Sequence, residues 1–216
     1  MSIDALEQMV EQQVRTWDVL DDRILDAMRS VPREQFVPRV WRSLAYADCE
    51  IALPCGKRML RPMVAGRILQ SLQVRPGEQV LEVGTGSGYL SACLARLGAR
   101  VRSLELHEPL AAQARENLAT QRFAAPVEVV TADAMQLQEQ AAYDAIVLTG
   151  SLPVYTPLFQ QALRPGGRLF VVIGAREPEQ ACLIRRAGER DFPREALFET
   201  VIEPLEHAPQ PPVFGF

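Results

Sequence analysis

The sequence predicts a single α/β domain built on a doubly wound, mostly parallel sheet. From residue 76 onward, short apolar runs alternate with helical patterns, which is typical of parallel strands covered by helices on both faces. A glycine-rich turn at 84–88 joins the first of these runs to a helix. The length of 216 residues suits one domain with an extension. We therefore divide the chain into an N-terminal helical extension with a loop (1–75), a core (76–207) and a proline-rich tail (208–216).

The N-terminal part is predicted to be mainly helical. Its expected elements are a helix at 5–16, a second helix capped by Asp21 or Asp22, a long loop at 46–61 and a helix from Pro62 to about residue 72. The helices are predicted from apolar residues at helical spacing, aspartate as an N-cap and proline in a first turn. The loop is predicted because its proline and glycine interrupt any regular period.

The core alternates between the two kinds of element. We expect strands at 80–83, 100–104, 127–130, 143–148 and 168–173, with helices at 89–97, 110–119 and 154–163. Arg164-Pro165-Gly166-Gly167 reads as a tight turn before the fifth strand. Two late apolar runs, 181–185 and 197–202, have no helix between them, so the sheet is expected to end in an antiparallel edge strand.

Composition argues against several classes of function. The formal net charge is -4 and the isoelectric point about 5.4, so no positive field is available to hold nucleic acid or an anionic membrane. No run approaches the roughly 20 apolar residues of a membrane span, and no secretory signal is visible, so we expect a cytoplasmic protein. The four cysteines form no C-x-x-C pair and only two histidines are present, so no metal site is expected.

The strongest local motif is the run Glu82-Val83-Gly84-Thr85-Gly86-Ser87-Gly88. Its glycines allow a sharp backbone turn and a close approach by a ligand. A dinucleotide site would have its third glycine at Tyr89, which makes a nicotinamide-dependent oxidoreductase the weaker alternative. An acid two residues before the first glycine suits a ligand with an ammonium and a sulfonium better than a pyrophosphate, which prefers an uncrowded helix N-terminus.

Acids also follow the next two predicted strands. Glu105 ends the second strand, where a carboxylate can accept hydrogen bonds from both ribose hydroxyls. Asp133 follows the third strand and can accept from an adenine amino group, while Thr149 follows the fourth. The carboxyl ends of parallel strands meet at one edge, so we expect these residues around a single crevice. The alternative is that each acid simply caps a helix.

These motifs, with Leu-Arg-Pro-Gly-Gly-Arg-Leu at 163–169, resemble class I S-adenosylmethionine-dependent methyltransferases. Val-Pro-Arg-Glu-Gln-Phe-Val-Pro at 31–38 is similar to the protein-L-isoaspartate O-methyltransferase family, and the likeness runs from about Leu6 to Leu205. It implies S-adenosylmethionine as cofactor and methylation of isoaspartyl carboxylates in damaged proteins. The cofactor residues that it implies are Glu82, Gly84, Thr85, Gly86, Gly88, Glu105, Leu106, Asp133, Ala134 and Thr149.

One segment departs from the family pattern. The family carries Gly-x-Gly-Gln-Thr-Ile-Ser-Gln-Pro before the helix at Pro62, and its serine is the usual active-site residue. In this chain Leu60 stands at the serine position, and the other changes introduce three cations, Lys57, Arg58 and Arg61. No catalytic residue is therefore predicted. These substrate-loop residues favour either a more anionic acceptor or a cofactor-binding member that lacks isoaspartyl activity and acts as a sensor or partner-binding module.

Overall fold

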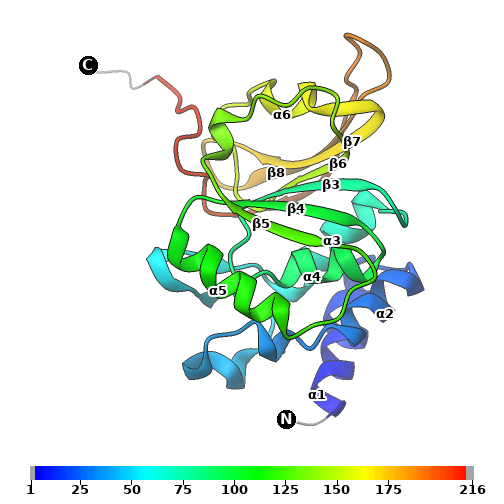
Figure 1. Cartoon of the computed structure of the whole chain (residues 1–216), viewed down its shortest axis with the longest axis vertical. Helices are drawn as coiled ribbons and strands as arrows, with labels where there is room; N and C mark the ends of the chain where they lie inside the picture. The colour runs from blue at the N-terminus through cyan, green and yellow to red at the C-terminus, as the bar shows by residue number, and fades with distance from the viewer. Residues whose placement is uncertain (1–2, 213–216) are drawn as a thin grey trace.

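The computed structural model describes residues 3–212 and is organised around one seven-stranded sheet (Figure 1). The strand order across it is β5-β4-β3-β6-β7-β8-β9. The strands are β3 (Gln79–Val83), β4 (Arg100–Glu105), β5 (Val127–Thr131), β6 (Tyr143–Leu148), β7 (Leu163–Ile173), β8 (Glu179–Arg185) and β9 (Arg194–Thr200). The first five are parallel to one another. The chain winds from β3 outward to β5 and then returns to the other side of β3, which leaves a crevice at the carboxyl ends of β3 and β6.

The far edge of the sheet is antiparallel, as the sequence predicts. β8 pairs antiparallel with β7, and β9 pairs antiparallel with β8. The reversed strand is thus β8, while the edge strand β9 again runs with the parallel set. The predicted turn at 164–167 lies inside β7 as a bulge, because Leu163 pairs with Tyr143 whereas Arg168 pairs with Ala145.

Helices cover one face of the sheet thickly and the other thinly (Figure 1). The helices are α1 (Ile3–Gln8), which continues as a π-helical segment Met9–Val14, α2 (Asp22–Ser30), α3 (Pro62–Leu72), α4 (Tyr89–Arg96), α5 (Glu108–Ala119) and α6 (Leu158–Gln161). Strand residues alternate between the two faces: Val80 belongs to the core shared with α3 and α4, and Leu81 to the core shared with α6. The N-terminal helices therefore share a core with the sheet.

Capping residues behave as predicted at two helix starts. The Asp21 side chain accepts a hydrogen bond from the backbone N–H of Arg23 at 3.0 Å and caps α2. Pro62 occupies the first turn of α3. Both devices fix the start of a helix that packs against the sheet.

Two predicted elements were wrong. The helix expected at 154–163 is reduced to α6, because Pro153 and Pro157 interrupt the backbone and Val154 is left exposed. The loop expected at 46–61 contains a small antiparallel pair, β1 (Ile51–Ala52) and β2 (Arg58–Met59). A 3-10 turn, Pro54–Gly56, joins these two strands, and Cys55 within it has a positive φ.

Other features concern the described part of the chain only. No helix within residues 3–212 is long and apolar enough to cross a membrane. Cys93 and Cys182 are buried free thiols. Of the predicted proline-rich tail, residues 213–216 lie outside the described residues.

Candidate active site

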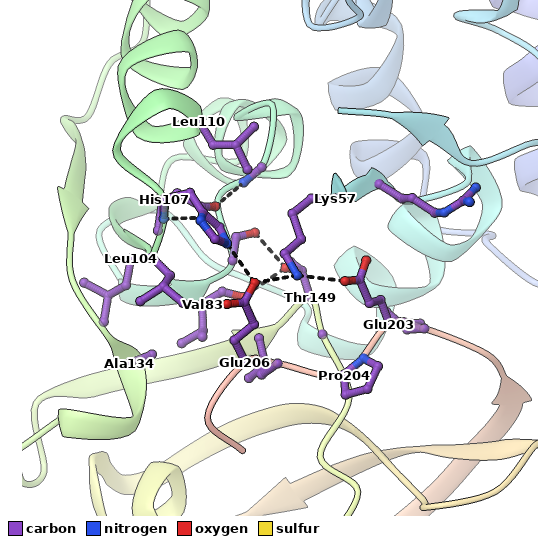
Figure 2. Close-up of a pocket in the computed structure, with 18 of the residues that line it drawn as sticks. Lys57, Val83, Leu104, His107, Leu110, Ala134, Thr149, Glu203, Pro204 and Glu206 are labelled. Atoms are coloured by element: carbon purple, nitrogen blue, oxygen red, sulfur yellow. Dashed lines mark hydrogen bonds and ion pairs between the residues drawn. The ribbon is translucent and has the colours of Figure 1, made fainter. Parts of the chain in front are cut away.

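A cleft of about 840 Å³ that is open to solvent lies at the carboxyl ends of β3, β4, β5 and β6. It brings together residues that the sequence places far apart (Figure 2). Seven of the ten residues implied for the cofactor line it: Gly84, Gly86, Glu105, Leu106, Asp133, Ala134 and Thr149. The crevice expected from the strand-helix alternation is therefore present.

The three glycines of the turn serve different needs. All have positive φ, +88° at Gly84, +54° at Gly86 and +84° at Gly88. A Cβ on Gly84 would lie 2.3 Å from the Thr149 hydroxyl oxygen, which donates to the carbonyls of Val83 and Gly84. A Cβ on Gly88 would meet Leu118 of α5 at 3.3 Å, and Gly88 does not line the cleft. Gly88 is thus required by helix packing, whereas Gly84 and Gly86 border the cleft.

Glu105 holds the glycine turn and the start of α5 together. Its carboxylate accepts from the backbone N–H of Gly86 at 2.9 Å and from that of His107 at 3.1 Å. The residue is 5% exposed and lines the cleft. A carboxylate has about four lone-pair positions, so Glu105 can still accept two hydrogen bonds from a ligand.

Asp133 has two roles in the structure. One oxygen accepts from the backbone N–H of Met135 at 2.9 Å and caps the 3-10 turn Ala134–Gln136. The other lies 2.9 Å from Nδ1 of His207. Asp133 therefore caps a turn, as the alternative interpretation of this acid predicts. It also lines the cleft, where its carboxylate can accept further hydrogen bonds from a ligand.

Glu82 lies in a second, smaller cavity of about 370 Å³ beside the cleft. It is fully buried and accepts hydrogen bonds from the hydroxyls of Ser91 and Ser103, the latter at 2.6 Å. Thr85, which also lines this cavity, is bonded to Ser103 at 2.6 Å. Burial raises the pKa of Glu82 to about 7, and the two hydroxyls oppose the rise only in part.

The substrate-loop residues divide into two groups. Leu60 and Arg58 line both the cleft and the smaller cavity, and they lie where the two meet. Lys57 lines the cleft, but its ammonium is paired with Glu203 and Glu206, each at 2.7 Å. Arg61 precedes α3 and lines neither cavity. The three predicted cations thus do not form one positive surface.

The sequence reasoning missed an entire wall of the cleft. Ile202, Glu203, Pro204, Leu205 and Glu206 come from the segment after β9 and close one side (Figure 2). Glu206 lies 2.8 Å from Nε2 of His107, and hydrogen bonds from Lys57 and His107 lower the pKa of Glu206 to about 2. No motif marks this segment, since only the folded chain brings it to the cleft.

The chain is similar to known proteins over nearly its whole length. The family model described as protein-L-isoaspartate(D-aspartate) O-methyltransferase matches residues 4–206. A protein-L-isoaspartate O-methyltransferase of Koribacter versatilis is 35% identical over 85% of this chain and 82% of its own. The corresponding protein of Methanoculleus marisnigri is 40% identical over 84% of this chain and 83% of its own.

A solved structure shares the fold. A Plasmodium falciparum chain assigned to the same enzyme class, in complex with S-adenosyl-L-homocysteine, aligns with a TM-score of 0.78. The alignment covers 93% of this chain and 98% of that one at 19% identity. Together with the match to the family model and the identity to relatives of similar length, the fold leads to one conclusion. The chain belongs to the protein-L-isoaspartate(D-aspartate) O-methyltransferase family.

Proposed function

We propose that this protein transfers the methyl group of S-adenosylmethionine to the side-chain carboxylate of isoaspartyl residues in damaged proteins. The observation that carries the proposal is the glycine turn at Gly84 and Gly86, which opens on a cleft bordered by Glu105 and Asp133 in a chain of this family.

The residues around the cleft suit the parts of this cofactor. We assign Glu105 to the ribose hydroxyls, because its carboxylate keeps two acceptor positions. We assign Asp133 to the adenine amino group on the same ground. Leu106 and Ala134 offer the apolar walls that a flat base requires. Glu82, Gly84, Thr85 and Gly86 are left for the methionyl end, with Glu82 as the acid nearest its ammonium.

When bound, S-adenosylmethionine would supply a methyl group on a positively charged sulfur. The acceptor carboxylate oxygen would bond to this methyl carbon without the help of a base, while the carbon–sulfur bond breaks and neutral S-adenosylhomocysteine leaves. The protein then has to align the two reactants and exclude water. Leu60 contributes an apolar surface at the junction of the two cavities. The hydroxyl of Thr149 donates to backbone carbonyls, so it is engaged in holding the turn.

The acceptor site differs from the expectation of a strongly cationic loop. The ammonium of Lys57 forms ion pairs with Glu203 and Glu206 of the cleft wall. Its charge is therefore used to hold this wall and is not available to an anionic acceptor. Arg58 is the loop cation that borders both cavities, and its Nε lies 3.9 Å from the carboxylate of Glu50. We therefore assign the acceptor carboxylate to the region between Leu60 and Arg58.

The test uses two peptides of the same sequence, one with an isoaspartyl and one with an aspartyl residue. Wild-type protein with isotopically labelled S-adenosylmethionine is expected to form a base-labile methyl ester on the isoaspartyl peptide alone. Binding of S-adenosylhomocysteine without ester formation would reject the transfer and favour a binding-only member of the family. Equal labelling of both peptides would reject the acceptor class.

A further inference from the structure

A short 3-10 helix, Arg39–Leu44, lies entirely exposed on the surface of the N-terminal extension. Three of its six side chains are large and apolar: Val40 is 79% exposed, Trp41 43% and Leu44 39%. They are three of the seven large apolar residues that are exposed within residues 3–212. Single exposed apolar residues are ordinary, but apolar residues gathered in one element indicate an interaction surface.

Two arginines on the same helix, Arg39 and Arg42, carry charges that no acid balances. Neither has an ion pair or a side-chain hydrogen bond among the described residues. The helix itself contains no acid, and the whole chain has a formal net charge of -4. The helix is therefore a small cationic and apolar surface on an acidic protein.

The geometry of a 3-10 helix sorts these side chains into rows, because residues three apart lie above one another. Arg39 and Arg42 form a cationic row. Trp41 and Leu44 form an apolar row beside it. A partner that covers both rows needs acidic and apolar side chains close together. Tryptophan and arginine are also among the residues that contribute most to binding at protein interfaces.

Buried residues hold the helix in place at both of its ends. Phe36 and Val37 before it are buried, and Ala45 after it is fully buried. The backbone N–H of Ala45 donates to the carbonyl of Arg42 at 3.2 Å. The exposed side chains are thus presented from a fixed backbone, which lowers the entropy cost of binding a partner.

The helix lies next to the region to which we assign the acceptor carboxylate. The guanidinium of Arg33 donates to the carbonyl of Ala45 at 3.0 Å and to that of Leu60 at 2.6 Å, so one side chain joins the end of the helix to Leu60. The helix also contacts β1, whose Ala52 pairs with Arg58 of β2. A polypeptide with its acceptor residue between Leu60 and Arg58 can therefore continue over the helix.

We propose that the 3-10 helix Arg39–Leu44 is a docking surface for the acceptor polypeptide, which places acidic side chains on Arg39 and Arg42 and apolar ones on Trp41 and Leu44. The proposal rests on the proposed function, which makes a polypeptide the methyl acceptor. It adds a recognition surface outside the cleft, so isoaspartyl residues in acidic and partly apolar segments are preferred. An anionic lipid surface fits less well, because the net charge of -4 opposes it.

The test measures, by fluorescence anisotropy, how isoaspartyl peptides bind to the protein loaded with S-adenosylhomocysteine. One peptide is a short uncharged core. Two carry an eight-residue extension of alternating glutamate and leucine, before or after the core, and two carry a glycine-serine extension of the same length. Such an extension reaches at most about 28 Å. At least one acidic extension is expected to tighten binding about tenfold, and the glycine-serine extensions less than about twofold. Unchanged affinity for both acidic extensions would overturn the proposal.

Variants of the helix test which side chains produce the gain in affinity. Arg39→Glu combined with Arg42→Glu is expected to remove most of it, and Trp41→Ala is expected to reduce it about threefold or more. Both variants are expected to bind the core peptide within about twofold of wild type. The gain is also expected to shrink as the salt concentration rises, because exposed ion pairs are screened. A gain that survives in both variants would contradict the docking surface.

Matched controls lie elsewhere on the chain. Arg96 and Arg100 are exposed and have no ion pair among the described residues, and Arg100 begins β4 at the end of the sheet opposite the cleft. Arg96→Glu combined with Arg100→Glu makes the same change in net charge. Trp17→Ala removes a tryptophan that is 41% exposed. Both controls are expected to keep the gain, and an equal loss in them would show that it does not come from this helix.

Other occupants of the surface would be recognised with the same variants. Cosedimentation with phosphatidylserine vesicles, or self-association in sedimentation velocity, would overturn the proposal if Arg39→Glu with Arg42→Glu abolished it and neither acidic extension tightened binding. Anisotropy requires no turnover, so the two proposals fail separately. Methyl ester formation on the core peptide without an effect of the extensions would reject this surface alone. Tighter binding of an extended peptide without ester formation would reject the proposed function alone.

Discussion

The ammonium of Lys57 and the carboxylate of Glu206 lie 2.7 Å apart and join the loop before α3 to the C-terminal segment 201–207, where both line the cleft (Figure 2). The pair is not isolated, because Glu203 contacts the same ammonium and His107 contacts the same carboxylate. Lys57 is one of the cations by which this loop departs from the family pattern. Its ion pairs hold the cleft wall at 202–206, which no sequence motif predicts.

We predict that Lys57→Met loosens this C-terminal segment. The backbone N–H of Leu205 donates to the carbonyl of Ser151 at 2.9 Å, and that of Ser151 donates to the carbonyl of Glu203 at 3.0 Å. Hydrogen exchange at these two amides is expected to rise about two- to fivefold, because partly exposed ion pairs contribute about 1 kcal/mol or less. Arg58→Met is the control, since Arg58 lies on the same loop and its ion pair is with Glu50, outside the segment. Equal effects of the two substitutions would contradict this role of Lys57.

The same cluster predicts a pH dependence. Lys57 and His107 hold the pKa of Glu206 at about 2, below its ordinary value, so the stabilisation is complete above about pH 4.5 and is lost as the pH falls through about 2. The protection factor of the Leu205 amide, which is the ratio of its intrinsic to its observed exchange rate, is therefore expected to have an acid-dependent component and to fall as the pH drops below about 4.5. In Lys57→Met this acid-dependent component is expected to be smaller. A component of unchanged size would exclude the ion pair as its cause.

Glu82 predicts a pH dependence of ligand affinity, which arises because burial raises the pKa of its carboxyl. Its pKa is raised to about 7 by burial, and only the ionised carboxylate attracts an ammonium. The affinity for S-adenosylhomocysteine is expected to rise about tenfold between pH 6 and 8, as the ionised fraction increases from about one tenth to about nine tenths. Calorimetry at several pH values measures this change. Glu82→Gln is expected to flatten the profile, and an equally steep profile in that variant would contradict the assignment.

The ligand-free protein should show the reverse trend. Because the pKa of Glu82 in the folded state lies above its ordinary value of 4.5, the folded state binds more protons than the unfolded state between about pH 4.5 and 7. The free energy of unfolding contributed by this group therefore falls as the pH rises through that range. The difference in urea-unfolding free energy between wild type and Glu82→Gln isolates the contribution. A difference independent of pH would contradict the raised pKa.

Gly84→Ala is predicted to lower the free energy of unfolding more than Gly77→Ala does. Gly84 and Gly77 have nearly the same φ, +88° and +87°, but a Cβ on Gly77 would have no atom within 4 Å. Gly77→Ala is expected to cost about 1 kcal/mol in urea unfolding, and Gly84→Ala about 2–4 kcal/mol, because its Cβ would clash with Thr149. Adding Thr149→Ala to Gly84→Ala should recover part of the loss. Similar losses for the two alanines would show that the close approach is unimportant.

Leu60→Ser is predicted to change the isoaspartyl activity little. A new neutral hydrogen bond contributes about 1 kcal/mol, which corresponds to less than about a tenfold increase in kcat/KM. The flanking Arg58 and the anchored Lys57 remain different from the family loop. Steady-state kinetics with the isoaspartyl peptide measures the effect. A gain of about a hundredfold or more would show that the missing hydroxyl alone limits this chain.

Much of the core was predictable because its strands are dense apolar runs flanked by turn residues. The strands at 80–83 and 143–148, for example, were confirmed as β3 and β6. The prediction of a helix at 154–163 was wrong because it rested on the spacing of apolar residues. Pro153 and Pro157 limit the helix to Leu158–Gln161. The hairpin of β1 and β2 was missed because strands of two residues leave no period to detect.

The site was predictable only where residues sit at strand ends. Glu105 and Asp133 follow β4 and β5, so the parallel sheet alone places them at one edge. Glu206 reaches the cleft through contacts with Lys57 and His107, which are distant in sequence. Glu82 lines the smaller cavity and not the cleft. This could not be predicted from its place in β3, because it depends on how the surrounding side chains pack.

The most direct test is a crystal structure with S-adenosylhomocysteine bound. We predict that its sulfur lies beside Gly84 and Gly86, its ribose hydroxyls donate to Glu105, and its adenine lies between Leu106 and Ala134. Density for the ligand outside this cleft, or adenosine bound with no contact to Glu105, would contradict the account.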